Sequence, residues 1–342
     1  MSAQNNKPVI PAIPIRNEWP VNMIPGDQSE FATEKEYDSE PAYLNEIRNA
    51  LVSPDSVIYK NGWLLKESVP APDYISYYRF RHLAKNLLFS KKASTGAQEP
   101  CLMVTDLWSA GHFHWLCDVL PRLWHTRDLT KDMLLLLPDD PYIRRIGLQS
   151  LELLGLRFRN IRWLKRGELL KVSRLFFLSR TGPSGHMHPE LMKAFRNKLV
   201  PENTSPAKKI YISRENAAYR KVVNEAPFRA LLQEYGFEIF RGEDLSFSDQ
   251  VGLFAQANTL LGLHGAGLTN AAFMQTGTKL VELRRKEHGP SNVGYWHLAN
   301  SLGLDYYYFN GIPDSDLPLV GRGCSLHIDL DMFRDFLKRN TL

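Results

Sequence analysis

The sequence lacks the features that mark several classes of protein. Its 342 residues include only three cysteines, Cys101, Cys117 and Cys324, too few and too scattered for a disulfide framework or a zinc cluster. No apolar run approaches the roughly 20 residues of a membrane-spanning helix. The N-terminus is polar and proline-rich, without the apolar core of a signal peptide. We therefore expect a cytoplasmic protein, either free or at the inner face of the membrane.

The sequence also has no large excess of either positive or negative charge. The chain has 42 basic and 37 acidic residues, a net charge of +5, which is well short of a dedicated nucleic-acid binder. The mild basic excess suits an anionic ligand such as a nucleotide sugar, or loose attachment to an anionic membrane face. Hydrophobic content of 44% and charged content of 23% are typical of a globular protein.

Strand and helix patterns alternate along the chain, which predicts an α/β fold with two domains. Residues 1–40 are polar and rich in proline, and we expect an extended or poorly ordered arm. Residues 41–200 form the first domain, with a parallel sheet, and residues 201–320 form the second. Residues 321–342 are expected to contribute a helix that packs back across the domain junction.

The second domain is organised around residues 258–284. A short apolar run ends at a turn with the sequence HGAG, and the pattern then predicts the start of a helix and a further strand. This turn is either a structural connection or a phosphate site, in which glycines allow close approach and the helix start offers N–H groups. It is neither a Walker loop nor a dinucleotide fingerprint. The candidate ligand-binding residues are His264, Gly265, Ala266, Gly267, Leu268, Thr269 and Asn270.

Cations follow another strand of the same predicted sheet. Arg214, Arg220 and Lys221 lie in a loop that is either a solvated basic loop or a clamp for a diphosphate. Because this loop and the glycine turn follow parallel strands, we expect them at one edge of the sheet. Glu282, at the end of the next strand, is a candidate acceptor of hydrogen bonds from a ribose.

The first domain contains a cluster of titratable residues in the stretch GHFHWLCDVLPR. His114 and Asp118 are four residues apart, so a helix would place them on one face. They could form a satisfied core pair, two ligands of a metal site, or a general base with its partner. His112, His186 and His188 are further candidates for lining a cleft on the acceptor side.

Three blocks together resemble glycosyltransferase family 61. The family includes bacterial capsular-polysaccharide proteins, plant xylan xylosyl- and arabinosyltransferases, and animal O-linked GlcNAc transferases of the secretory pathway. The blocks, within residues 105–310, are GHFHWLCDVLPRL, YISRENAAYRKVVNE and LLGLHGAGLTNAAFMQTGTKLVEL.

The resemblance implies a GT-B-like fold, in which two Rossmann-like domains face a central cleft. It implies inverting transfer from a nucleotide sugar, most plausibly a UDP-sugar, with no cofactor and no metal. Arg214, Arg220, the turn from His264 to Asn270, and Glu282 would surround the nucleotide. His114 and Asp118 would lie at the acceptor side, where one of them takes the proton from the acceptor hydroxyl.

The resemblance also sets expectations for the biological role. The acceptor would be a glycan or lipid-linked glycan in the biosynthesis of a cell-surface or capsular polysaccharide. Peripheral membrane attachment and a homodimer are further options, and no nucleic-acid partner is expected. The alternative functions are a nucleotide-sugar hydrolase and a non-catalytic nucleotide- or glycan-binding subunit of a polysaccharide assembly complex.

Overall fold

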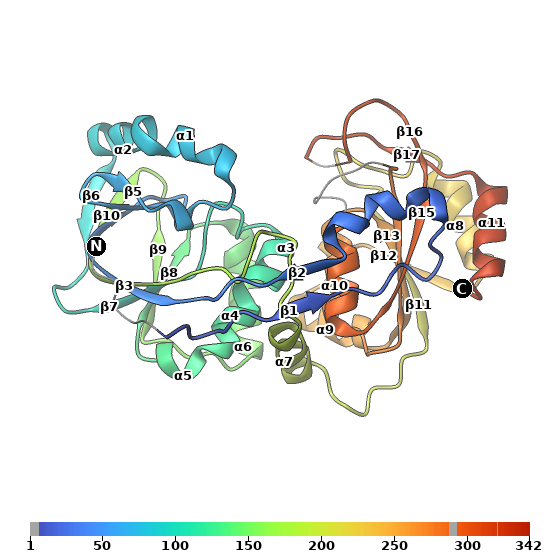
Figure 1. The fold of residues 1–342 in the computed structure, drawn as a ribbon, viewed down its shortest axis with the longest axis horizontal. Helices are drawn as coiled ribbons and strands as arrows, with labels where there is room; N and C mark the ends of the chain where they lie inside the picture. The colour runs from blue at the N-terminus through green and yellow to red at the C-terminus, as the bar shows by residue number, and fades with distance from the viewer. Residues whose placement is uncertain (1–6, 287–292, 320) are drawn as a thin grey trace. The chain divides into compact units, whose positions relative to one another are not determined.

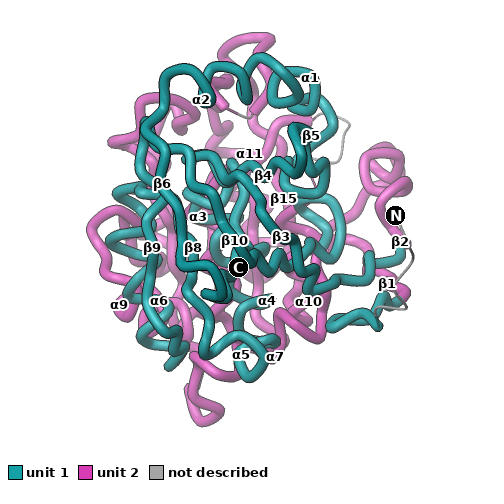
Figure 2. The backbone as a smooth tube through the Cα atoms, turned by 90° about the vertical axis from the view of Figure 1, so that its left-hand side faces the viewer, with its two compact units in different colours: residues 1–13, 38–186 teal, residues 14–37, 187–342 magenta. Residues whose placement is uncertain are grey.

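The computed structural model describes residues 7–286, 293–319 and 321–342. The chain divides into two compact units (Figures 1 and 2). Unit 1 comprises residues 1–13 and 38–186, and unit 2 comprises residues 14–37 and 187–342. This division differs from the expected boundaries after residues 40 and 200.

Unit 1 is built on an eight-stranded mixed sheet. The strand order is β5-β4-β3-β10-β7-β8-β9, and β6 also pairs with β10. The β3, β4 and β5 strands are antiparallel to their neighbours, so the expected parallel sheet is found only in the remaining strands. The strands are β3 (Leu44–Val52), β4 (Ile58–Lys60), β5 (Trp63–Leu64), β6 (Lys91–Ser94), β7 (Pro100–Met103), β8 (Leu134–Pro138), β9 (Asn160–Leu164) and β10 (Glu168–Leu178).

Several described helices of unit 1 contain a π turn. One of these turns, η6, interrupts the helix that carries His114 and Asp118, and π turns are frequent at functional sites. The helical segments are η3 (Lys66–Ser68), η4 (Pro72–Tyr74), α1 (Ile75–Tyr77), the π turn η5 (Tyr78–His82), α2 (Leu83–Phe89), α3 (His112–His114), the π turn η6 (Trp115–Val119), α4 (Leu120–His125), α5 (Arg127–Thr130), the π turn η7 (Ile143–Gly147) and α6 (Leu148–Leu153).

Unit 2 contains an all-parallel sheet of five strands, as the alternating pattern predicts. Its order is β12-β11-β13-β14-β15, so β12 lies on one side of β11 and β13 lies on the other. The strands are β11 (Lys208–Ile212), β12 (Phe237–Phe240), β13 (Ala257–Leu263), β14 (Lys279–Arg284) and β15 (Asp305–Asn310); the short strands β16 (Ile312–Pro313) and β17 (Leu326–His327) pair separately.

Helices cover both faces of this sheet (Figure 1). One face packs against α8 and α11, where Phe228, Phe309 and Phe333 meet edge to face at 4.9–5.0 Å between ring centroids. The apolar side of α11 is therefore buried within unit 2, against α8 and the sheet. The helical segments are α7 (Pro189–Leu199), α8 (Glu225–Glu234), η8 (Gly242–Asp244), α9 (Phe247–Ala255), the 3₁₀ helix η9 (Ala266–Phe273), α10 (Gly294–Leu302) and α11 (Leu330–Arg339).

The N-terminal segment of residues 14–37, here called the strap, is a packed part of unit 2. It contains β1 (Pro14–Arg16), η1 (Pro25–Glu30), η2 (Ala32–Glu34) and the start of β2 (Glu36–Asp38). Phe31 is fully buried against Trp296, and the Trp296 indole donates to the carbonyl of Glu18 at 2.8 Å. The expectation of a poorly ordered arm is therefore wrong for the strap, and residues 1–6 lie outside the described residues.

The strap also supplies a buried charge. Glu30 forms an ion pair with Arg284 at the end of β14, at 2.5 Å, and both side chains have no exposed surface. An isolated buried guanidinium would be costly, so this carboxylate makes the strap necessary to unit 2. None of the helices in the described part of the chain has both the length and the apolar character needed to span a bilayer.

Candidate functional site

The glycine turn and the basic loop lie where the strand order of unit 2 reverses. Arg214 follows the carboxyl end of β11, and His264 and Gly265 follow the carboxyl end of the adjacent β13. In open α/β sheets ligands bind outside the carboxyl ends of the strands at such a reversal. The expectation that the two segments share one edge of the sheet is confirmed.

The two arginines converge on Gly265. A Cβ atom at Gly265 would lie 3.0 Å from Nη1 of Arg214 and 3.7 Å from Nη1 of Arg220, and its φ of 152° disfavours other residues. Arg214 Nε donates to the backbone carbonyl of Arg220 at 3.0 Å, which fixes the side chain of Arg214 against the backbone of the basic loop. Lys221 is held through its backbone, which donates to Oγ of Ser325 at 3.2 Å.

This cationic pair forms no ion pair among the described residues, although the charge of Glu243 acts on Arg214 at longer range. No carboxylate there lies within ion-pair distance of either guanidinium, and Arg220 Nε is buried without a hydrogen-bond partner in that part of the chain. Burial lowers the pKa of both arginines, and for Arg214 the neighbouring charge of Arg220 lowers the pKa further. An anion bound between them would relieve both effects.

The turn itself differs from the expected helix start. Residues Ala266–Phe273 form a 3₁₀ helix, in which Leu268 N donates to the carbonyl of Gly265 at 3.0 Å. Thr269 and Asn270, expected as donors to a phosphate, are buried, and Asn270 Nδ2 donates to the carbonyl of Gly267 at 3.1 Å. Asn270 thus supports the turn from within, whereas Oγ1 of Thr269 has no hydrogen-bond partner among the described residues.

Glu282 also has a different role from the expected contact with a ribose. Its side chain is fully buried, and its two oxygens are engaged: Oε1 pairs with Nδ1 of His264, and Oε2 accepts from the hydroxyl of Tyr306 at 2.6 Å. Neither oxygen is available to a ligand. Glu282 instead orients His264 at the start of the glycine turn.

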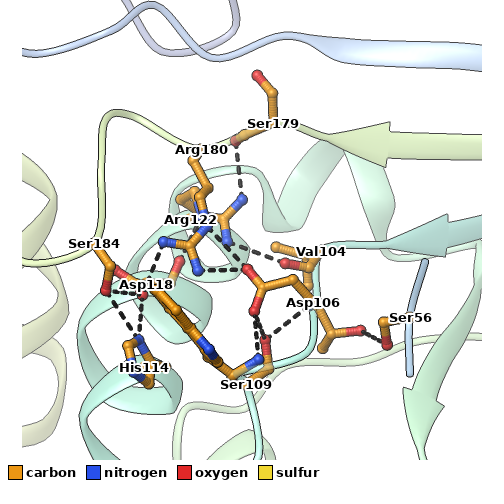
Figure 3. A network of polar contacts seen from close by, with 12 residues as sticks. Ser56, Val104, Asp106, Ser109, His114, Asp118, Arg122, Ser179, Arg180 and Ser184 are labelled. Atoms are coloured by element: carbon orange, nitrogen blue, oxygen red, sulfur yellow. Dashed lines mark hydrogen bonds and ion pairs between the residues drawn. The ribbon is translucent and has the colours of Figure 1, made fainter. Parts of the chain in front are cut away.

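In unit 1, His114 and Asp118 form the predicted pair on one helix face (Figure 3). Nδ1 of His114 lies 2.9 Å from Oδ2 of Asp118, and Oγ of Ser184 contacts both, at 3.0 Å and 3.2 Å. The side chain of His114 is 24% exposed, but that of Asp118 only 9%. Of the two, the imidazole is therefore the group that a ligand can reach.

Two arginines surround the carboxylate of Asp118, and the sequence analysis missed them. Arg180 Nη1 lies 3.2 Å from Oδ2 of Asp118, and the same guanidinium binds Asp106 at 2.5 Å. Arg122 is buried one turn further along the helix and donates to the carbonyls of Val104 and Leu178 at 3.0 Å and 2.9 Å. Their position in the sequence could have indicated a role in the site, since Asp106 and Arg180 each follow the carboxyl end of a strand.

The arginines decide the charge of Asp118. Burial alone would raise the pKa of this carboxyl, but the charge of Arg180, the hydrogen bond with His114 and the charge of Arg122 together bring it below its ordinary value. Asp118 is therefore a stable carboxylate and a weak proton acceptor. For Arg122, burial and the charge of Arg180 lower the pKa to about 10.

A cavity of about 590 Å³ lies at the carboxyl ends of β7, β8 and β9. Asp106, Asp139 and Asp140 contribute carboxylates to its lining, and Tyr77 and Phe89 contribute aromatic rings. Asp106 connects this cavity to the His114–Asp118 pair through Arg180. The cavity thus combines polar and aromatic groups and is linked to His114 through a chain of charged side chains.

The remaining candidate histidines have separate positions. His112 lies on the same helix as His114, and its Nδ1 is 2.8 Å from the hydroxyl of Tyr142. His186 is the last residue of unit 1, next to Gly182, and His188 is buried at the start of α7 in unit 2. Of the three, only His112 belongs to the helix of the proposed acceptor side.

Comparison with known protein families identifies the class. Residues 112–281 match the model of the family described as Glycosyltransferase 61. The chain therefore carries a domain of glycosyltransferase family 61, and the protein is a glycosyltransferase (EC 2.4). The matched range begins at His112, includes both the His114–Asp118 pair and the glycine turn, and ends one residue before Glu282. No curated protein matches the chain.

Proposed function

We propose that the protein is an inverting, metal-independent glycosyltransferase that moves a sugar from a UDP-sugar to a hydroxyl of a glycan or lipid-linked glycan. The observation that carries the donor side is the pair Arg214 and Arg220, two guanidiniums at the sheet edge that form no ion pair with a carboxylate of the described residues. A diphosphate would supply that pairing. Guanidiniums bind phosphate oxygens in a bidentate manner and stabilise charge that grows on a leaving group.

The glycine turn completes the diphosphate site in this proposal. Gly265 permits the backbone to approach the ligand, because any side chain there would meet Arg214. His264, oriented by Glu282, presents its second ring nitrogen at the same turn. The arginines take the role that a divalent ion has in other transferases, which is the basis for the metal-independent mechanism.

We assign the general base to His114 and a positioning role to Asp118. As the acceptor oxygen forms its bond to the anomeric carbon, its proton passes to Nε2 of His114. The bond from that carbon to the diphosphate breaks, and its electron pair leaves with the diphosphate. Asp118 accepts the Nδ1 proton of His114 in a hydrogen bond, which fixes the tautomer and stabilises the imidazolium that forms.

Transfer requires the acceptor held by unit 1 to reach the donor held by unit 2. The proposal therefore includes the GT-B arrangement, with the two units facing a central cleft. The product would be part of a cell-surface or capsular polysaccharide made on the cytoplasmic side.

Thermal shift with nucleotides tests the donor site. UDP and UDP-sugars should raise the melting temperature of the wild-type protein, and Arg214→Ala with Arg220→Ala should abolish this shift. Arg334→Ala is the matched control, because Arg334 lies in the same unit but on α11, where its side chain is 39% exposed and paired with Glu234. An unchanged shift in the double variant would refute the assignment.

Turnover assays test the reaction. Transfer to an acceptor should persist in EDTA, and the new glycosidic bond should have the opposite anomeric configuration to the donor. Activity that is lost in EDTA and restored by manganese would contradict the metal-independent mechanism. Release of sugar to water with every acceptor tried would instead indicate a hydrolase.

A further inference from the structure

Residues 74–92 of unit 1, here called the basic helical segment, carry a net charge of +5. The segment has no acidic residue, and its basic residues are Arg79, Arg81, Lys85, Lys91 and Lys92. With 42 basic and 37 acidic residues in the full chain, the remaining residues carry equal numbers of each. All five basic residues are exposed. The segment thus presents five exposed cations with no acidic residue among them.

The same segment exposes large apolar side chains. Leu88 and Phe89 are 75% and 81% exposed, and Tyr77, Phe80 and Leu87 are about half exposed or more. The spacing of Tyr77, Phe80, Leu87 and Leu88 places them along one side of a helix.

Another exposed ring extends this apolar side beyond the segment. Trp63 of β5 is 60% exposed and lies edge to face with Phe80, at 6.4 Å between ring centroids.

These exposed residues are not needed for the core of unit 1. The inner side of the helix already packs through Tyr78 and Leu83, which contact Val57 and Tyr59. The inner side also has its polar anchor, since Nδ1 of His82 lies 2.7 Å from the hydroxyl of Tyr59. In Figure 1, α1 and α2 lie at the outer edge of unit 1. The outer side of the segment is therefore a second apolar face bordered by cations.

We propose that the basic helical segment, together with Trp63, attaches unit 1 to an anionic phospholipid bilayer. A helix with apolar residues on one side and Lys and Arg beside them lies in the plane of the membrane interface, where the rings enter the headgroup region. The cations bind the negatively charged headgroups. Tyr and Trp favour this interface because one end of each ring system is polar.

The cavity gives this attachment a consequence for the acceptor. Tyr77, Lys85 and Phe89 belong both to the segment and to the cavity lining. The membrane-bound face therefore borders this cavity, and if the acceptor binds there, a glycan whose lipid carrier stays in the bilayer would fit. This part of the inference rests on the proposed function, whereas the attachment itself does not.

The charge argues against a second copy of the chain as the occupant of this face. A symmetric dimer would bring the same patch of each subunit together, so five cations would face five cations without an intervening acid. A bilayer offers both the apolar depth for Leu88 and Phe89 and the opposite charge for the surrounding basic residues.

Vesicle flotation with the full chain tests the proposal. Wild-type protein should float with vesicles of phosphatidylcholine and phosphatidylglycerol, should not float with phosphatidylcholine alone, and should be released by 0.5 M salt. Each basic residue near an anionic surface contributes about fivefold to binding. The charge reversal Arg79→Glu with Arg81→Glu should therefore weaken binding at least about 25-fold.

A second variant tests the apolar contribution. Leu87→Ser with Leu88→Ser should weaken binding by about tenfold for each leucine that inserts. Both leucines are exposed, so the variant should keep the wild-type melting temperature.

Matched controls come from exposed residues elsewhere in unit 1. Leu129→Ser with Leu153→Ser, and Lys131→Glu with Arg157→Glu, should bind vesicles like the wild type. Equal binding to neutral vesicles, no binding to anionic vesicles, or equal loss in the controls would overturn the proposal. So would a dimer that dissociates in the leucine variant without any vesicle binding. Flotation needs no donor and no turnover, so its outcome is independent of the proposed transfer reaction.

Discussion

Replacing His114 by asparagine isolates the atom that we assign as the base. The amide of asparagine can still form a hydrogen bond with Asp118 near the position of Nδ1, but nothing replaces Nε2. General-base catalysis contributes about 10² to 10⁴ in rate, or about 3–5 kcal/mol of transition-state stabilisation. We expect kcat to fall by that factor. KM for the nucleotide sugar should stay within about twofold, since the residues assigned to the donor belong to unit 2.

Three further variants separate the base from its supports. Asp118→Asn keeps the imidazole but removes a charge-assisted hydrogen bond worth about 1.5–3 kcal/mol, so kcat should fall about 10- to 150-fold. Ser184→Ala removes a neutral hydrogen bond and should cost about fivefold. His112→Asn, two residues away on the same helix but bonded to Tyr142, should leave kcat nearly unchanged.

The assay is steady-state kinetics across pH with a saturating donor. The acidic limb of the kcat profile should disappear in His114→Asn but persist, displaced, in Asp118→Asn. The reasoning is refuted if Asp118→Asn is as impaired as His114→Asn and also loses the acidic limb, because the carboxylate would then be the base. It is equally refuted if both variants retain wild-type kcat.

The remaining predictions concern the glycine turn, the strap and the charge of Asp118. Gly265→Ala should raise KM for the donor about tenfold or more, since its φ of 152° costs an alanine roughly 1–3 kcal/mol and the new Cβ meets Arg214. Glu30→Gln should lower the free energy of unfolding by about 3–5 kcal/mol, measured with urea, because Arg284 stays buried without its partner. Asp118→Asn should destabilise the fold at pH 7, and this difference should begin to shrink as the pH falls below about 3.8, where the unfolded carboxyl takes up its proton, and disappear only below the lowered pKa of the folded carboxyl.

Each of these predictions has its own check. Glu36→Gln is the control for Glu30→Gln, because Glu36 pairs with Arg16 where both side chains are more than half exposed, so its loss should cost under about 1 kcal/mol. Gly265→Ala should lower the melting temperature without ligand by only a few degrees, as the strain at its φ requires, and a normal donor KM would show that the backbone there does not approach the ligand. A destabilisation by Asp118→Asn that is equal at pH 7 and pH 3 would contradict the charged state assigned to this carboxyl.

The parts of the site that could be predicted are local in sequence. The spacing of His114 and Asp118 specifies their contact, since residues four apart meet on a helix. The edge shared by Arg214 and Gly265 follows from strands that alternate with helices. In both cases the prediction needs only the element type and the direction of the chain.

The parts that could not be predicted depend on distant partners. Glu30 pairs with Arg284 across 254 residues, and the strap has neither helical nor strand periodicity to indicate that it is packed. Glu282 was assigned to a ligand because its position at a strand end is right, but Tyr306 on the next strand already occupies one of its oxygens. Whether a charged residue is buried next to another buried charge depends on the tertiary structure, and it cannot be predicted from the pattern of residue types along the sequence.

The strap can pack only late in the synthesis of the protein, because the residues that it contacts lie near the other end of the sequence. Residues 14–37 leave the ribosome among the first, whereas Arg284, Trp296 and Tyr306, which they contact, leave among the last. Residues 38–186 can collapse meanwhile, because that sheet needs nothing from the strap. The strap cannot pack, and Phe31 stays exposed, until β14 and β15 have been synthesised. Closing a loop over such a sequence separation is also slow. Premature termination anywhere before β15 would thus leave an apolar N-terminal segment open to chaperones and proteases.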